Sequence, residues 1–173
     1  MLYWLLKTEP DVFSYSDLER LGSSPWDGVR NYQARNHLRA MQLGDLALIY
    51  HSSTKIPGIA GIARISQTAH ADALQFKPDS PYFDPKSPAD NPRWSQICLE
   101  PVQPIEFLQL TQLRQDPKLE SMLILRKGNR LSVTPVEKKH FLQILKLTST
   151  QLVKHIAPKV TNSQSLANSR QLN

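Results

Sequence analysis

Proline restricts the folding of this chain more than any other residue type. The sequence has 13 prolines against 6 glycines, and seven of the prolines lie between Pro78 and Pro104. Because proline fixes its own φ angle and restricts the residue before it, this stretch should be extended and rich in loops. We expect a surface loop over 77–93, followed by an edge or bulged strand over 94–107.

The composition predicts one ordinary globular domain. With 173 residues, of which 40% are hydrophobic and 21% charged, the chain is long enough to bury a sizeable core. The single cysteine, Cys98, excludes an internal disulfide and a multi-cysteine metal site. The sequence has neither a membrane-spanning apolar run nor the pattern of a signal peptide. We therefore expect an intracellular protein, cytoplasmic or associated with the nucleoid or nucleus, without a membrane partner.

Short apolar runs predict further strands. Residues 2–7, 45–51 and 58–67 are rich in β-branched, leucine and aromatic residues and are too short for core helices. The polar segment between the second and third runs is a loop long enough to form the rim of a pocket.

Capping residues and apolar spacing predict three helices, over about 15–21, 31–44 and 135–147. Two shorter helices are expected between 110 and 125. The signals for the three longer helices are the pair Ser16 and Glu19 with Gly22, the stripe Ala34, Leu38 and Met41, and the run Thr134, Pro135, Val136 and Glu137.

The basic charge is concentrated near the C-terminus. Residues 1–125 carry 12 basic and 14 acidic side chains, whereas 126–147 carry 6 basic and 1 acidic. A pI near 9.5 therefore does not by itself indicate nucleic-acid binding. Basicity supports such binding only if Arg126, Lys127 and Arg130 share a face with other exposed cations.

The sequence contains no strong catalytic signature. It has no phosphate-binding glycine loop, no serine-nucleophile motif and no zinc-protease motif, and its five histidines have no common metal-ligand spacing. We expect no cofactor and no bound metal.

Aromatic and polar side chains occur together at the expected strand ends and helix starts. A flat base needs an aromatic face for stacking and fixed donors and acceptors at its edge, which such positions provide. For each aromatic residue the alternative is plain core packing. Arg30, Arg35 and Arg39 recur near one helix face, where they contact either phosphates or only solvent.

Five separated segments resemble the EVE domain family. They are YWLLKTEP, WDGVRNYQARNHLRAMQLGD, YHS, PYFDPKS with a following RW, and RKGNRLSVTPVEKKHF. The resemblance covers about 2–147 and implies an α+β, PUA-like fold, a small mixed β-barrel with surrounding helices. It leaves 148–173 as a largely flexible C-terminal extension, in which a short helix over 150–157 is compatible with the sequence.

The resemblance also implies a pocket for a modified base of DNA or RNA. The ligand-binding positions would be Trp4, Lys7, Thr8, Glu9, Trp26, Val29, Arg30, Asn31, Tyr32, Tyr50, His51 and Ser52. Rim or supporting positions that the resemblance implies would be Tyr82, Asp84, Arg130 and Ser132. The charge pattern adds Arg35, Arg39, Arg126 and Lys127 as candidates for contact with the nucleic-acid backbone.

The function that these residues favour is non-enzymatic reading of a base in nucleic acid. One alternative is a nuclease or base-modifying hydrolase on the same fold, with Glu9, Asp27, Lys7 or His51 as acid and base. Another is a module that binds a small molecule or a protein. The sequence leaves the oligomeric state and the choice between DNA and RNA open.

Overall fold

The computed structural model describes residues 1–152 and contains six strands and four α-helices in that part of the chain. In chain order the elements are β1 (Tyr3–Thr8), α1 (Tyr15–Leu21), β2 (Ser24–Trp26), α2 (Tyr32–Ala40), β3 (Leu46–His51), β4 (Gly58–Ala71), β5 (Ser95–Gln109), α3 (Leu110–Gln115), β6 (Val133–Val136) and α4 (Lys138–Leu147). Short 3-10 turns cover Ala73–Phe76, Pro117–Leu119 and Leu123–Leu125. Most of the possible helix over 150–157 lies outside the described residues.

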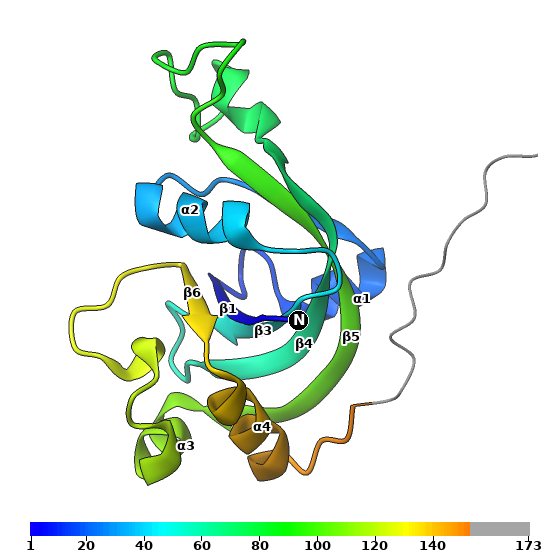
Figure 1. Ribbon diagram of the computed structural model, residues 1–173, viewed down its shortest axis with the longest axis vertical. Coiled ribbons are helices and arrows are strands. Elements are labelled where there is room, and N and C mark those ends of the chain that lie inside the picture. Colours follow the sequence, from blue (N-terminus) through cyan, green and yellow to red (C-terminus); the bar gives the residue numbers. More distant parts are fainter. Residues whose placement is uncertain (153–173) are drawn as a thin grey trace, which may run out of the picture.

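The strands form one curved, mixed sheet in the order β2-β5-β4-β3-β1-β6. The pair β1 and β3 is parallel, and the other neighbours are antiparallel. Strands β4 and β5 are long and bend through the whole molecule (Figure 1). The α+β class with a mixed sheet and surrounding helices is confirmed, and β2 and β6 are the two edges of the sheet.

Alternating side chains divide the interior into two cores, one on each face of the sheet. Trp4 and Leu6 of β1 pack in the first core with residues of α1 and α2, whereas Leu5 packs in the second core with residues of α3 and α4. The same alternation along β3 places Ile49 in the first core and Tyr50 in the second. The position of each strand residue therefore decides which of two separate environments it reaches.

The prolines of β5 lie where the strand has a neighbour on one side only. Strand β2 pairs with β5 only up to Leu99, and beyond it Pro101 and Pro104 pair with β4 alone. The β4–β5 register shifts at several places in this region. A bulged edge tolerates proline because the missing amide donor is not needed there, so the prediction from the sequence is confirmed.

The predicted start of α1 and the predicted end of α2 differ from the structure. Helix α1 is capped by Ser14 and Asp17, which form the reciprocal capping box, rather than by Ser16 and Glu19. Gly22 ends α1 in the left-handed conformation, as predicted. The turn predicted after α1 contains the short strand β2, and α2 ends at Ala40, earlier than Gly44.

The helix predicted over 135–147 begins only at Lys138. The run with the sequence pattern of a helix cap is strand β6, in which Thr134 pairs with Leu5 and Pro135 with Trp4 of β1. Pairing with β1 buries Val133, Thr134 and Val136, and this long-range burial outweighs the local cap signal. Pro135 is tolerated because β6 is an edge strand.

The proline-rich segment forms an arm, defined here as residues 72–94, at the end of the molecule opposite α3 and α4 (Figure 1). The arm is a loop over most of its length, as predicted, and helix α2 holds its base. Arg35 donates to the Arg93 carbonyl at 3.0 Å, and Arg39 donates to the Ser95 hydroxyl at 2.9 Å. The Tyr32 ring stacks on Trp94 with 4.9 Å between ring centroids.

A buried carboxylate fixes the start of β1. Asp45 is 2% exposed and accepts hydrogen bonds from the Leu2 amide at 2.7 Å, the Trp4 indole at 3.1 Å and the Gln42 amide at 3.0 Å. These bonds join β1 to the turn before β3. Removing the carboxylate would leave three donors without an acceptor, and each such loss is costly.

We expect Asp45→Ala to lower the free energy of unfolding by about 3 kcal/mol, because buried donors lose a charged acceptor. Asp79→Ala, which removes an exposed carboxylate of the arm, should change it by less than about 0.5 kcal/mol. Chemical denaturation followed by tryptophan fluorescence measures both values. Equal losses in the two variants would contradict the structural role of Asp45.

Candidate nucleic-acid-binding site

A large cavity of about 680 Å³ opens at the end of β1. Its walls come from β1 and the following turn, from β2 and the loop that leads into α2, from the arm and from the loop before β6. The lining residues are Lys7, Thr8, Glu9, Val12, Phe13, Ser24, Pro25, Trp26, Asp27, Gly28, Val29, Arg30, Ser52, Tyr82, Arg130 and Ser132. The volume lies within the usual range of small-molecule pockets.

Trp26 gives this cavity a buried aromatic wall. It is 8% exposed, and the Phe13 ring meets it edge-on with 6.3 Å between centroids and an interplanar angle of 82°. The sequence has three tryptophans, and the indole N–H groups of Trp4 and Trp94 donate to Asp45 and Asp84. Among the described residues the Trp26 N–H has no acceptor, and it is not sealed from the cavity.

A second buried carboxylate holds the loop between β2 and α2 against the arm. Asp72 is fully buried and accepts from the Gly28 amide at 3.0 Å, the Leu74 amide at 2.8 Å and the Arg30 guanidinium at 2.7 Å. Arg30 also donates twice to the Tyr82 carbonyl, at 2.6 and 2.8 Å. Most of the Arg30 guanidinium is therefore bonded inside the protein, although the side chain is still 21% exposed.

Gly28 lets the Tyr82 ring form part of the cavity wall. The φ angle of Gly28 is +70°, and a Cβ atom at this position would lie 2.8 Å from the Tyr82 ring. Only glycine satisfies both the left-handed backbone and this close approach.

Two titratable side chains of the cavity have perturbed pKa values. Burial raises the pKa of the Asp27 carboxyl, and the nearby negative charge of Asp72 raises it further. Burial lowers the pKa of the Lys7 ammonium group, whose nitrogen lies 3.5 Å from the Asn129 carbonyl. No side chain in the described part of the protein donates to the Asp27 carboxylate. Asp27 is thus an exposed acid at the cavity whose carboxylate accepts only from its own backbone amide and can meet a ligand.

Comparison with known proteins identifies the family of this chain and its fold. The sequence model of the EVE domain matches residues 2–147. The chain belongs to the EVE domain family. Its fold is the PUA-like fold of that family.

Its relatives include proteins of animals and bacteria. Human thymocyte nuclear protein 1 is 38% identical over 165 residues, which cover 84% of this chain and 73% of the human protein. A Pseudomonas syringae protein of known structure is 48% identical, with a TM-score of 0.82, and the match covers 84% of this chain and 99% of that one. Human THYN1 in complex with DNA containing 5-methylcytosine is 38% identical, with a TM-score of 0.81, and the match covers 87% and 99% of the two chains.

The cavity of this EVE domain brings together ten of the residues that the sequence singled out. Seven belong to the predicted ligand-binding set: Lys7, Thr8, Glu9, Trp26, Val29, Arg30 and Ser52. Three belong to the predicted rim: Tyr82, Arg130 and Ser132. Two of the hydroxyls already have partners, since Thr8 donates to the Phe13 carbonyl at 2.8 Å and Ser52 to the Thr8 carbonyl at 3.2 Å.

Two predicted stacking residues lie in the cores instead. Trp4 is 4% exposed and packs in the first core, with its indole bonded to Asp45. Tyr50 is 3% exposed and packs in the second core, on the opposite face of the sheet. Neither ring lines the cavity.

Three further predicted ligand-binding residues have structural partners outside the cavity. His51 accepts from the Tyr15 amide at 3.1 Å and so supports the start of α1. Asn31 caps α2 by accepting from the amides of Gln33 and Ala34. Tyr32 stacks on Trp94 at the base of the arm.

Five of the eight predicted rim residues also lie outside the large cavity. Arg35 and Arg39 bind the arm, and Asp84 accepts from the Trp94 indole at 2.8 Å, so all three act within the protein. Arg126 lines a separate cavity and Lys127 lines neither. Arg35 and Arg39 both bond to the arm, although Arg39 remains exposed.

The sequence argument missed several cavity residues: Val12, Phe13, Ser24, Pro25 and Gly28. It named Asp27 as a candidate acid or base of the enzyme alternative but did not include it in the ligand-binding set. Phe13 lies immediately before the Ser14 cap of α1, and this helix start was the available signal. Within residues 1–152 no cluster of three or more His, Cys, Asp or Glu side chains is arranged to hold a metal, and no helix is long and apolar enough to cross a membrane.

The Gly28 contact gives a direct test of this cavity wall. Gly28→Ala should lower the free energy of unfolding by more than about 2 kcal/mol, because left-handed strain of about 1–2 kcal/mol is added to displacement of Tyr82. Gly22→Ala is the matched control, since Gly22 has φ +72° but no atom within 4 Å of the place that an alanine methyl group would take. Denaturation curves of both variants separate strain from contact. Equal losses would contradict the close packing of Tyr82.

Proposed function

We propose that this EVE domain binds DNA and holds an extruded, methylated cytosine base in the large cavity. The observation that carries the proposal is a pair of cavity residues with unused polar groups. Trp26 and Asp27 line the cavity, and no other residue of the described protein bonds to the Trp26 N–H or to the Asp27 carboxylate. The human relative whose structure contains DNA with 5-methylcytosine supports the choice of ligand.

The aromatic walls suit a planar base. Trp26 is anchored by the edge contact with Phe13, and the Tyr82 ring is held beside Gly28 by the Arg30 and Asp72 bonds. Both rings are therefore positioned before a ligand enters. Stacking on such a platform contributes about 1–3 kcal/mol per base, and a fixed platform loses little entropy on binding.

Asp27 supplies the group that distinguishes cytosine. An acidic side chain accepts a hydrogen bond from the exocyclic amino group of cytosine, which thymine lacks. The 5-methyl group makes thymine and 5-methylcytosine alike in shape. Pocket shape therefore cannot separate these two bases, and a polar contact to the base edge is needed.

The cations near the cavity favour contact with a phosphate backbone on the side of the loop before β6. Lys7 and Arg130 line the cavity, and Arg126 and Lys127 stand on the same loop as Arg130. Within residues 1–152, Arg126, Lys127 and Arg130 form no ion pair. We infer that the loop before β6, and not helix α2, contacts the phosphates.

Binding is favoured over acid–base catalysis by the positions of the candidate groups. His51 is occupied by the Tyr15 amide and lies outside the cavity. Glu9 accepts from the Ser53 hydroxyl at 2.9 Å, so its carboxylate already has a side-chain partner within the protein. The free acid in the cavity, Asp27, is therefore proposed as a reader of the base edge.

The base assignment is tested with Asp27→Asn and duplexes that contain one 5-methylcytosine or one thymine at the same mismatched position. The wild-type protein should prefer 5-methylcytosine, and the variant should bind it about tenfold more weakly, within the 1–3 kcal/mol of one base-edge contact. An amide also donates to the thymine carbonyl, so the preference should move toward thymine.

Asp11→Asn removes an exposed acid outside the cavity and should leave both affinities unchanged. Fluorescence anisotropy measures all the dissociation constants. A 5-methylcytosine to thymine ratio that is the same in the wild type and in Asp27→Asn would remove Asp27 from the proposal. Lack of binding to every duplex would reject the proposed function itself.

The backbone assignment predicts a different result for Arg130→Gln. This change should weaken binding by a similar factor for all duplexes and reduce the slope of log affinity against log salt by about one. Arg114→Gln, an exposed cation of α3, should alter neither quantity. If the two variants behave alike across a salt titration, the phosphates lie elsewhere.

A further inference from the structure

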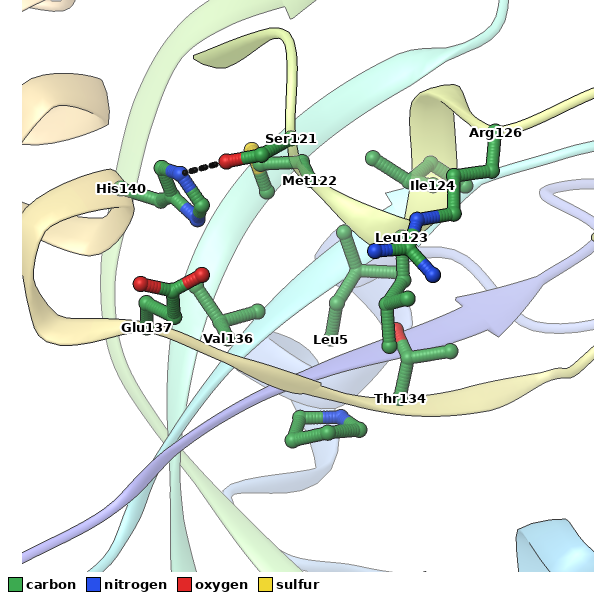
Figure 2. Close-up of a pocket in the computed structure, with 11 residues that line it drawn as sticks. Leu5, Ser121, Met122, Leu123, Ile124, Arg126, Thr134, Val136, Glu137 and His140 are labelled. Atoms are coloured by element: carbon green, nitrogen blue, oxygen red, sulfur yellow. Dashed lines mark hydrogen bonds between the residues drawn. The ribbon is translucent and has the colours of Figure 1, made fainter. Parts of the chain in front are cut away.

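A second, smaller cavity of about 260 Å³ lies between β1, β6, the start of α4 and the segment 121–126 (Figure 2). It is separate from the large cavity and shares none of its lining residues. At about 30 Å³ per water molecule, it has room for roughly eight waters or a ligand of about ten non-hydrogen atoms.

The middle of this cavity is apolar. Leu5, Met122 and Val136 are buried members of the second core, and Ile124 packs against the same core. Water in contact with such walls makes few hydrogen bonds, so an apolar group that replaces it is favoured.

One buried polar group in the cavity has no partner. Thr134 is 1% exposed and lines the cavity. None of the residues that the structure describes bonds to its hydroxyl, which is not sealed from the cavity. A bound ligand would give this hydroxyl a partner.

An unpaired cation, Arg126, lies on the side of the cavity where Thr134 lies. Figure 2 shows the Arg126 guanidinium on the side of Thr134, and the Ser121–His140 pair at the other side. No carboxylate within residues 1–152 pairs with Arg126. Glu137, which also lines the cavity, is paired with Lys139 at 3.0 Å.

The opposite side ends in a neutral polar pair. The Ser121 hydroxyl and the His140 Nε2 atom are 3.0 Å apart, and burial lowers the pKa of the His140 imidazole. In the described structure no carboxylate bonds to the other ring nitrogen of His140, so the pair does not complete a catalytic triad. The pair itself adds no charge, and the Glu137 carboxylate on this side is paired with Lys139.

We propose that this cavity binds a small carboxylate with an apolar body. The carboxylate accepts hydrogen bonds from the Arg126 guanidinium and the Thr134 hydroxyl, and the apolar body lies among Leu5, Met122 and Val136. A charge-assisted pair at one end and apolar contact along the rest give both orientation and affinity. The proposal does not depend on the function of the large cavity.

The test uses hexanoate, hexan-1-ol and hexylamine as probes in amide NMR titrations of the full chain. Hexanoate at millimolar concentration should give saturable shifts at the amides of 121–126 and 134–140. Hexan-1-ol should bind about tenfold more weakly, because it lacks the charge that pairs with arginine, and hexylamine should give no saturable shifts.

Two variants assign the contacts. Arg126→Gln should weaken hexanoate binding about tenfold and leave hexan-1-ol binding unchanged, and Thr134→Val should weaken hexanoate binding severalfold without loss of fold. Arg130→Gln, on the same loop but facing the large cavity, should have no effect on hexanoate. Absence of saturable hexanoate shifts, equal binding of hexylamine, or wild-type affinity in Arg126→Gln would each overturn the proposal.

Discussion

The large cavity depends on the buried carboxylate of Asp72. This side chain stands at the point where β4 leaves the sheet and the arm begins, and it accepts from the Gly28 and Leu74 amides and from Arg30. A fully buried carboxylate is stable only when such donors surround it. The bonds therefore join two segments that are more than forty residues apart in sequence, and both segments line the cavity only because they are joined.

Arginine side chains extend this connection into a stack of cations and aromatic rings. The Arg30 guanidinium lies 5.4 Å from the centroid of Tyr82 and 5.5 Å from that of Trp94, and Arg35 lies 4.8 Å from that of Tyr32. Each contact adds a modest amount of stability. Together they hold a loop rich in proline, which has few amide donors for backbone bonds of its own. The basic residues of α2 stabilise the arm, and the positive charge available to a ligand comes from elsewhere.

Local signals in the sequence account for the elements better than for the partners of each residue. The apolar runs predicted β1, β3 and β4 but neither β2 nor β6, and the prolines predicted both the arm and the bulged edge of β5. The cap-like run before α4 misled the prediction because Thr134 and Pro135 pair with β1, which is distant in sequence. Trp4 lies in an apolar run and Trp26 in a segment with turn residues, but this local pattern does not reveal the partner of either indole. What separates them is Asp45, a carboxylate 41 residues from Trp4 that occupies one indole and leaves the other free.

The basic excess of residues 126–147 resolves into groups with different surroundings. Gly128, with φ +80°, turns the chain between Arg126 and Arg130, so one guanidinium lines the small cavity and the other the large one. Lys139 of α4 is paired with Glu137 and contributes to neither. Net charge is a property of the whole segment, whereas a ligand meets only the cations that the fold leaves unpaired beside a cavity. The left-handed turn at Gly128 therefore separates two arginines that are close in sequence, so that they line different cavities.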